Sequence, residues 1–146
     1  MFRTAAILIA RLIFAGVFAM AATFKFADMP ATAAFIAAIN FPAPELFAWL
    51  AALFEVALVF AFLTGLYFSE AALLAAAYVL FLAFAFHGPS HWAGNQVEFG
   101  FFVDHFSFIA GLLFAAVHGP GNAVVVRNPF HPRRLETQDH RAPNFS

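Results

Sequence analysis

Three side chains with proton-transfer chemistry lie in stretches of sequence that are otherwise apolar. They are the carboxylates Glu55 and Asp104 and the imidazole His105. An imidazole takes up and releases protons near neutral pH, and ionisable groups inside membrane spans are typical of proton pathways. The pattern therefore predicts a proton relay in which Glu55, Asp104 and His105 are the catalytic residues.

Three further side chains, Arg11, Lys25 and His87, are predicted to bind the ligand that such a relay serves. Arg11, Phe18 and Lys25 recur every seven residues, which places them on one face of a helix and puts Lys25 at its outer end. For Arg11 a structural interpretation is favoured. Arg11 is expected to pair with Glu55 and so to fix the register of two antiparallel helices, an arrangement that we call a lock.

The composition determines the solvent in which these groups must work. Of the 146 residues 64% are hydrophobic and 10% are charged, and the mean hydropathy is +0.85. Soluble domains have roughly 45–50% apolar and about 25% charged residues, so a soluble protein is excluded. A net charge of −1 gives no basic field for nucleic acid. With no cysteine, thiolate sites and disulfides are excluded, so redox chemistry requires a bound cofactor or a partner.

Four apolar segments are long enough to cross a bilayer, which takes about 20 residues. They cover residues 4–24, 46–66, 71–86 and 99–117. Short connections make neighbouring spans antiparallel, so the predicted fold is all-α, an integral membrane four-helix bundle running up-down-up-down. A short helix at the membrane interface is expected within 31–39. Residues 1–121 form this transmembrane domain, and residues 122–146 form a polar, Arg-containing tail.

The distribution of basic residues predicts the orientation. Arg3 precedes the first span and four arginines follow the last one, whereas the connection after the third span has no Lys or Arg. Basic residues favour the cytoplasmic side. We therefore expect a multi-pass protein of a bacterial inner membrane with both termini in the cytoplasm and the tail as a dock for a partner. A cleaved signal ending at Ala19-Met20-Ala21 is disfavoured because Arg11 interrupts its apolar core.

Polar side chains then gather toward the outer half of the membrane, a group that we call the polar crown. Its members are Lys25, Asp28, Glu45, His87, His91, Glu98, Asp104 and His105. His87, Asp104 and His105 could exchange protons with a quinone, which is the expected cofactor. The alternative is simple hydration at the level of the lipid headgroups.

A metal site in the polar crown is a weaker interpretation. Imidazoles and a carboxylate suit zinc, copper or iron, and His87 and His91 are four residues apart. Gly88-Pro89 breaks the helix that would align them, so no metal ligand is assigned. The 23 phenylalanines are mainly lipid-facing and core bulk, and the alternative is that some line a quinone or pigment pocket.

Small and polar residues follow one another on the last span at helical spacing. They are Asp104, Ser107, Gly111, Ala115 and His118. Small residues allow helices to approach closely in membranes. This face is therefore expected to pack inward and to take Asp104 with it.

Several of these residues resemble the sequence pattern of the DoxX family. The resemblance lies in Arg11-Leu12-Ile13-Phe14 with Lys25-Phe26, in Glu55 with Gly65, and in His118-Gly119-Pro120-Gly121. It covers about residues 4–126. The chain departs from the pattern at Ala22, Ser69-Glu70 and Val124 to Val126, where the family usually has glycine, Thr-Arg and Ser-x-Asp.

The resemblance implies a four-helix membrane fold and a redox setting. Some DoxX-like proteins are membrane subunits of thiosulfate:quinone oxidoreductase, others associate with redox or detoxification enzymes, and many have no assigned reaction. The resemblance supports Arg11, Lys25 and Glu55, whereas the other site residues depend on the physical argument alone.

The leading hypothesis is a membrane subunit of a quinone-linked electron-transfer assembly. It binds quinone or partner subunits, membrane-embedded or peripheral, and relays protons while a partner supplies electrons. The alternative is a purely structural subunit with no chemistry of its own. A transporter is a third hypothesis, disfavoured because the four spans show no repeat.

Overall fold

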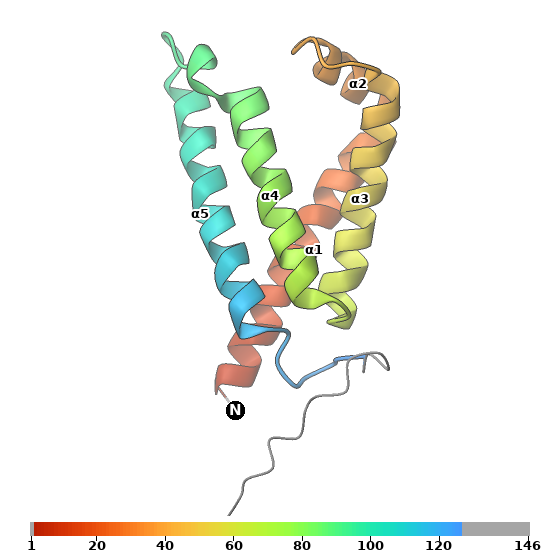
Figure 1. Ribbon diagram of the computed structural model, residues 1–146, viewed down its shortest axis with the longest axis vertical. Coiled ribbons are helices and arrows are strands. Elements are labelled where there is room, and N and C mark those ends of the chain that lie inside the picture. Colours follow the sequence, from red (N-terminus) through yellow and green to blue (C-terminus); the bar gives the residue numbers. More distant parts are fainter. Residues whose placement is uncertain (1, 127–146) are drawn as a thin grey trace, which may run out of the picture.

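The computed structural model describes residues 2–126, and these residues form helices and no strand. The elements are α1 (Phe2–Ala27), α2 (Met29–Ala37), α3 (Pro44–Thr64), α4 (Phe68–His87), the short 3₁₀ helix η1 (Pro89–His91) and α5 (Gln96–His118) (Figure 1). Four of them, α1, α3, α4 and α5, are long and apolar enough to cross a membrane. The all-α fold with four membrane-spanning helices is confirmed, and the chain is a multi-pass membrane protein in contact with lipid.

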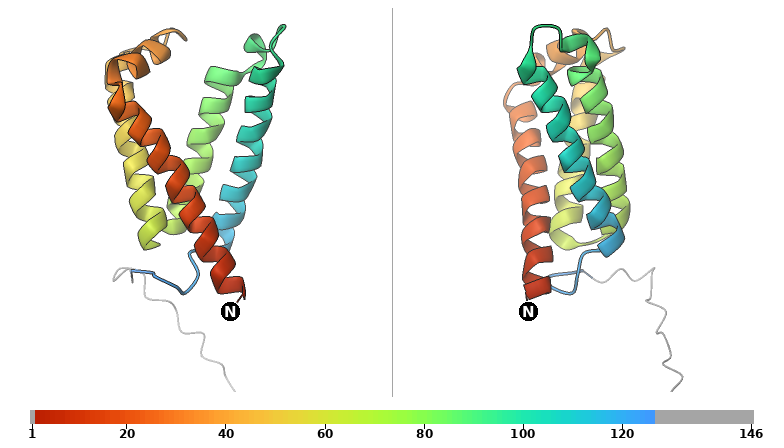
Figure 2. Two further views of the ribbon diagram at one scale, coloured as in Figure 1. Left: turned by 180° about the vertical axis from the view of Figure 1, so that it is seen from behind. Right: turned by 90° about the vertical axis from the view of Figure 1, so that its left-hand side faces the viewer.

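The helices form two arms that meet at one end and diverge toward the other (Figures 1 and 2). One arm pairs α1 with α3, and the other pairs α4 with α5. We call the end with residues 62–68 and 118–126 the narrow end, and the end with α2 and η1 the wide end. Helix α2 packs against α3 at the wide end.

Aromatic side chains hold the two arms together toward the narrow end. The ring of Phe108 in α5 lies 5.3 Å from that of Phe14 and 5.8 Å from that of Phe18, both in α1. Phe62 of α3 lies 5.5 Å from Phe14 and 5.5 Å from Phe68 at the start of α4. Tilted and edge-on pairs at these distances suit the charge distribution of aromatic rings. This cluster therefore joins all four spans.

Local sequence signals explain where the helices begin and end. Asp28 caps α2 by accepting a 3.0 Å hydrogen bond from the backbone N–H of Ala31, and Asn95 caps α5 in the same way. Gly65 ends α3 with a left-handed backbone at φ 73°. The third span is longer than predicted, because α4 begins at Phe68 and ends at His87. The predicted place of α2 at the membrane interface stays a prediction.

The segment that follows α5 turns back beneath the bundle. The backbone N–H of Val126 donates a 2.9 Å hydrogen bond to the carbonyl of Thr64 at the end of α3. Most of the predicted docking tail, residues 127–146 with its four arginines, lies outside the described residues. The division at residue 121 therefore remains a prediction.

Candidate functional site

A buried carboxylate in the middle of α3 lies at the centre of the candidate site. Glu55 is 1% exposed and lies 11 residues from the start of α3, about 16 Å along the helix axis. Lys25 of α1 donates hydrogen bonds of 2.7 and 2.9 Å to its two oxygens. Tyr78 of α4 donates a third, of 2.9 Å, to Oε1. Three spanning helices therefore meet at one carboxylate.

This ion pair is nearly removed from solvent. The side chain of Glu55 is 2% exposed and that of Lys25 is 21% exposed. Taking two charges out of water is costly, and only short, well-formed hydrogen bonds repay that cost. All the buried side-chain polar atoms in residues 2–126 have a hydrogen-bond partner. Each charge of the pair is therefore matched by an opposite charge or a hydrogen bond, and Lys25 is the partner that is partly exposed.

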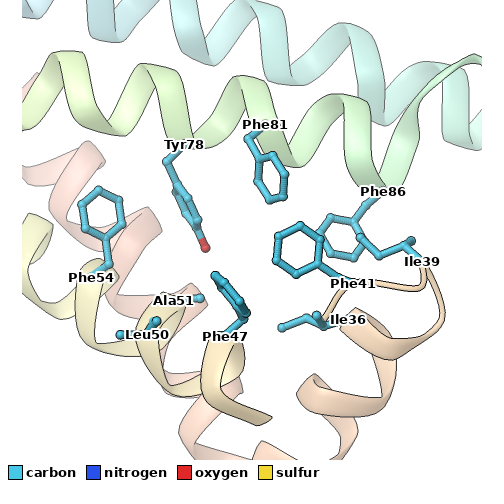
Figure 3. A pocket seen from close by; sticks show the side chains of 10 residues that line it. All are labelled: Ile36, Ile39, Phe41, Phe47, Leu50, Ala51, Phe54, Tyr78, Phe81 and Phe86. Carbon is cyan, nitrogen blue, oxygen red and sulfur yellow. The ribbon is translucent and has the colours of Figure 1, made fainter. Parts of the chain in front are cut away.

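An apolar cavity of about 380 Å³ lies between α2, α3 and α4 and reaches this site. Five phenylalanines line it together with aliphatic side chains: Phe41, Phe47, Phe54, Phe81 and Phe86. Tyr78 is the lining residue with a polar side-chain group. Figure 3 shows this side chain extending from α4 across the cavity, with its hydroxyl directed toward α3.

The cavity has the properties of a site for a small, mostly apolar ligand. Such sites have volumes of roughly 300–1,000 Å³, apolar walls and few polar groups. Leu50 and Phe81 line it and are also exposed, so it opens on the side of the bundle where lipid lies. A ligand in the bilayer can therefore enter laterally and meet the hydroxyl of Tyr78 at the inner wall.

Arg11 has a different role from the predicted one. The residue is 1% exposed, and its guanidinium donates to five backbone carbonyls at the narrow end. Two belong to Phe62 and Leu63 at the end of α3, and three belong to the segment after α5. The last carbonyls of a helix have no partner within the helix, and an arginine has five donors that can satisfy them. The predicted lock between Arg11 and Glu55 is wrong, and Lys25 is the residue that pairs with Glu55.

The other predicted residues form a second group near the wide end. The ring N–H of His87 Nδ1 donates to Glu98 Oε2 at 2.6 Å, because a carboxylate can only accept. The ring of His105 lies 5.1 Å from that of His87, and its Nδ1–H donates to the carbonyl of Phe101 at 2.6 Å. The nitrogen of the Trp92 indole donates to the carbonyl of His87 at 2.8 Å. This group therefore joins α4 to α5, and no contact with Glu55 is found within residues 2–126.

Asp104 does not pack inward as predicted. Its side chain is exposed, as is that of Ser107 one turn further along the helix. Helix α5 packs along α4, and Asp104 lies seven residues before Gly111, so the two residues share one face of α5. The polar stripe is covered at Gly111, where a Cβ would lie 3.4 Å from the ring of Phe14. The prediction thus holds for Gly111 and Ala115, which are half-buried, and is wrong for Asp104, Ser107 and His118, which are exposed.

Tyr78 was missed as a site residue by the reasoning from sequence. The signal was present, because a phenolic hydroxyl in the middle of an apolar span requires a hydrogen-bond partner. Counted from the narrow end, Tyr78 lies ten residues into α4 and Glu55 lies nine residues before the end of α3, so the two are at similar depths of about 15 and 14 Å. In the described part of the chain, no group of three or more histidines, aspartates or glutamates is arranged to hold a metal ion.

Comparison with known proteins identifies one family. The DoxX family model matches residues 6–88, which is more than half of the 146-residue chain and includes Arg11, Lys25, Glu55 and Tyr78. No curated protein and no solved structure matches the chain.

Proposed function

The chain belongs to the DoxX family, and from that premise we propose that it is a quinone-binding membrane subunit of a redox assembly. The observation that carries the proposal is the hydroxyl of Tyr78. It lines an apolar cavity that opens toward lipid and is hydrogen-bonded to the buried carboxylate of Glu55. A quinone has a flat, apolar ring with one oxygen at each end, which suits such a cavity.

The hydrogen-bond directions favour the reduced form of the ligand. Tyr78 gives its only hydroxyl hydrogen to Glu55, so its oxygen lone pairs remain to accept a hydrogen bond from the cavity. A quinol has a hydroxyl that can donate to this oxygen, whereas a quinone has only acceptors. We therefore expect tighter binding of the quinol while Glu55 is ionised.

The same three residues can hold and move a proton. A proton arriving at the Tyr78 oxygen from a ligand hydroxyl allows the original hydroxyl proton to pass to Glu55 Oε1 over 2.9 Å. Lys25 forms an ion pair with Glu55 and is the partly exposed end of this chain of groups. A redox partner exchanges the electrons, since the sequence has no cysteine to hold an iron–sulfur cluster.

The proposal includes the cellular setting predicted from the sequence. Arg3 in the first turn of α1 and the four arginines after residue 126 support cytoplasmic termini in a bacterial inner membrane. With that orientation the wide end, with α2 and η1, faces outward. Residues 122–146 are proposed to dock a peripheral partner on the cytoplasmic side.

A purely structural subunit is the second candidate. The observation that favours it is the exposure of α5, which is the least covered of the four spans and suits attachment to a neighbour. In this case the pair of Lys25 with Glu55 serves only to hold α1 against α3.

Binding of a short-chain quinol to the purified protein in detergent separates the two candidates. Equilibrium dialysis under anaerobic conditions should show saturable binding that Tyr78→Phe weakens by about two- to tenfold, the value of one hydrogen bond. Tyr67→Phe is the matched control, because it removes a hydroxyl that lies outside the cavity. Ala51→Phe, which places a ring in the cavity, should abolish binding.

The absence of saturable binding to the wild type would reject the quinone proposal and favour the structural candidate. Equal binding by the wild type and the Tyr78→Phe variant would reject the assigned role of the hydroxyl.

A further inference from the structure

Helix α5 is the spanning helix that the rest of the described chain covers least. Of the residues in its apolar stretch 6% are buried, compared with 28% in α1, 28% in α3 and 39% in α4. Only Leu112 is buried among the residues of α5. Phe108 brings it against α1 toward the narrow end, and the two helices separate toward the wide end (Figure 2).

The separation uncovers one end of a stripe of small and polar residues on α5. Gly100, Asp104, Ser107 and Gly111 are three or four residues apart, so they share one side of the helix. Gly111 is covered by the ring of Phe14, whereas a Cβ at Gly100 would meet nothing within 4 Å. Asp104 and Ser107 are exposed. We call Gly100, Asp104 and Ser107 the open stripe.

The carboxylate of Asp104 requires a partner that the described residues do not provide. It lies eight residues into α5, about 12 Å along the axis and therefore well within a bilayer. It makes no hydrogen bond or ion pair with residues 2–126. An ionised carboxylate facing lipid is costly, so such groups usually pair with another polar group.

We propose that the open stripe binds a transmembrane helix of another protein that carries a lysine or arginine at the depth of Asp104. The opposite charge compensates Asp104, Ser107 can hydrogen-bond across the contact, and Gly100 permits close approach of the two backbones. This interface lies on α5, apart from the cavity at Tyr78, and its existence is independent of quinone binding.

A second copy of this chain is a poorer occupant because its basic groups within the described spans are already engaged. Arg11 is 1% exposed and bonded to five carbonyls. Lys25 is paired with Glu55. Two open stripes brought together would place two carboxylates in the same apolar contact. Charge complementarity therefore selects a different protein with a basic residue in its span.

Energy transfer in phosphatidylcholine vesicles tests the proposal with defined probes. The full chain, labelled with a donor dye, is titrated with an acceptor-labelled leucine-rich transmembrane peptide that has one lysine at mid-depth. A peptide with leucine at that position is the matched control. The wild type should bind the lysine peptide about tenfold more tightly than the leucine peptide.

Asp104→Asn should remove this preference, and the neutral amide should leave the fold intact because Asp104 makes no hydrogen bond or ion pair within residues 2–126. Glu70→Gln, which neutralises another exposed carboxylate at the start of α4, should keep the preference. Equal binding of the two peptides by the wild type, or a preference that survives Asp104→Asn, would overturn the proposal. A second outcome would also overturn it: energy transfer between donor-labelled and acceptor-labelled copies of the chain that is lost in the Asp104→Asn variant. That result would favour self-association through the open stripe.

Discussion

Replacement of Lys25 by methionine tests whether the buried carboxylate depends on its ion pair. The change removes hydrogen bonds of 2.7 and 2.9 Å and leaves Glu55, 2% exposed at its side chain, with Tyr78 as its remaining donor. Breaking a buried ion pair by removing one partner costs about 3–5 kcal/mol. Because the Lys25 side chain is 21% exposed, we expect a loss of about 3 kcal/mol, at the lower end of that range.

The double variant Lys25→Met with Glu55→Gln should recover most of this stability. Glutamine is neutral and its carbonyl can still accept the hydrogen bond from Tyr78, so no buried charge remains. Unfolding in mixed detergent micelles, followed by far-ultraviolet circular dichroism, gives the free energy of unfolding. It is measured for four proteins: the wild type, Lys25→Met, Glu55→Gln and the double variant. We expect a coupling energy of about 2 kcal/mol between the two positions. Costs that add to within about 0.5 kcal/mol would refute the ion pair as the source of stability.

Two changes at the narrow end test the packing beneath the bundle. Arg11→Lys keeps the charge but replaces five spread donors with three on one nitrogen, so amide hydrogen exchange in residues 121–126 should become faster. Unchanged exchange would contradict the assigned hydrogen bonds. Gly65→Ala forces an alanine to φ 73° and places its Cβ 3.1 Å from that of Pro120. The backbone alone should cost about 1–2 kcal/mol. Gly94→Ala is the control, because Gly94 has a similar φ of 75° and an added Cβ there would meet nothing within 4 Å. Equal losses of unfolding free energy at the two glycines would show that the contact with Pro120 contributes nothing.

The four spans could be predicted from sequence because length and hydropathy alone determine which segments can cross a bilayer. The spacing of Arg11 and Lys25 also predicts correctly that both lie on one face of α1. In the structure that face turns toward α3. Burial of Glu55 follows from its charge, since a carboxylate in the middle of a span avoids lipid.

The choice of partner for Glu55 could not be predicted in this way. Arg11 and Lys25 are 14 residues apart, about 21 Å along α1, and the tilt and register of α1 against α3 decide which one reaches Glu55. Arg11 instead meets the carbonyls at the end of α3, because Gly65 ends that helix at its level. Sequence spacing defines a helical face and leaves the register between helices open.

The divergence of the two arms could not be predicted from the sequence either. A stripe of small residues predicts close packing of a helix but does not say which neighbour provides it. In α5 the neighbour at Gly111 is α1, whereas Asp104, two turns before it, is exposed. Figure 2 shows α1 and α5 separating toward the wide end. The cavity beside Tyr78 depends on the same divergence, since it lies between α3 and α4 of opposite arms.

Photolabelling with an azido-quinone in native-like lipid nanodiscs, followed by mass spectrometry of the labelled peptides, tests the assignment of the cavity most directly. The label should appear on residues 36–54, which cover the end of α2, the connection to α3 and the first half of α3, and on residues 78–86 of α4. Excess short-chain quinol should displace it. Labelling confined to other surfaces, or labelling of the cavity that excess quinol does not reduce, would contradict the assignment of a quinone site at Tyr78 and Glu55.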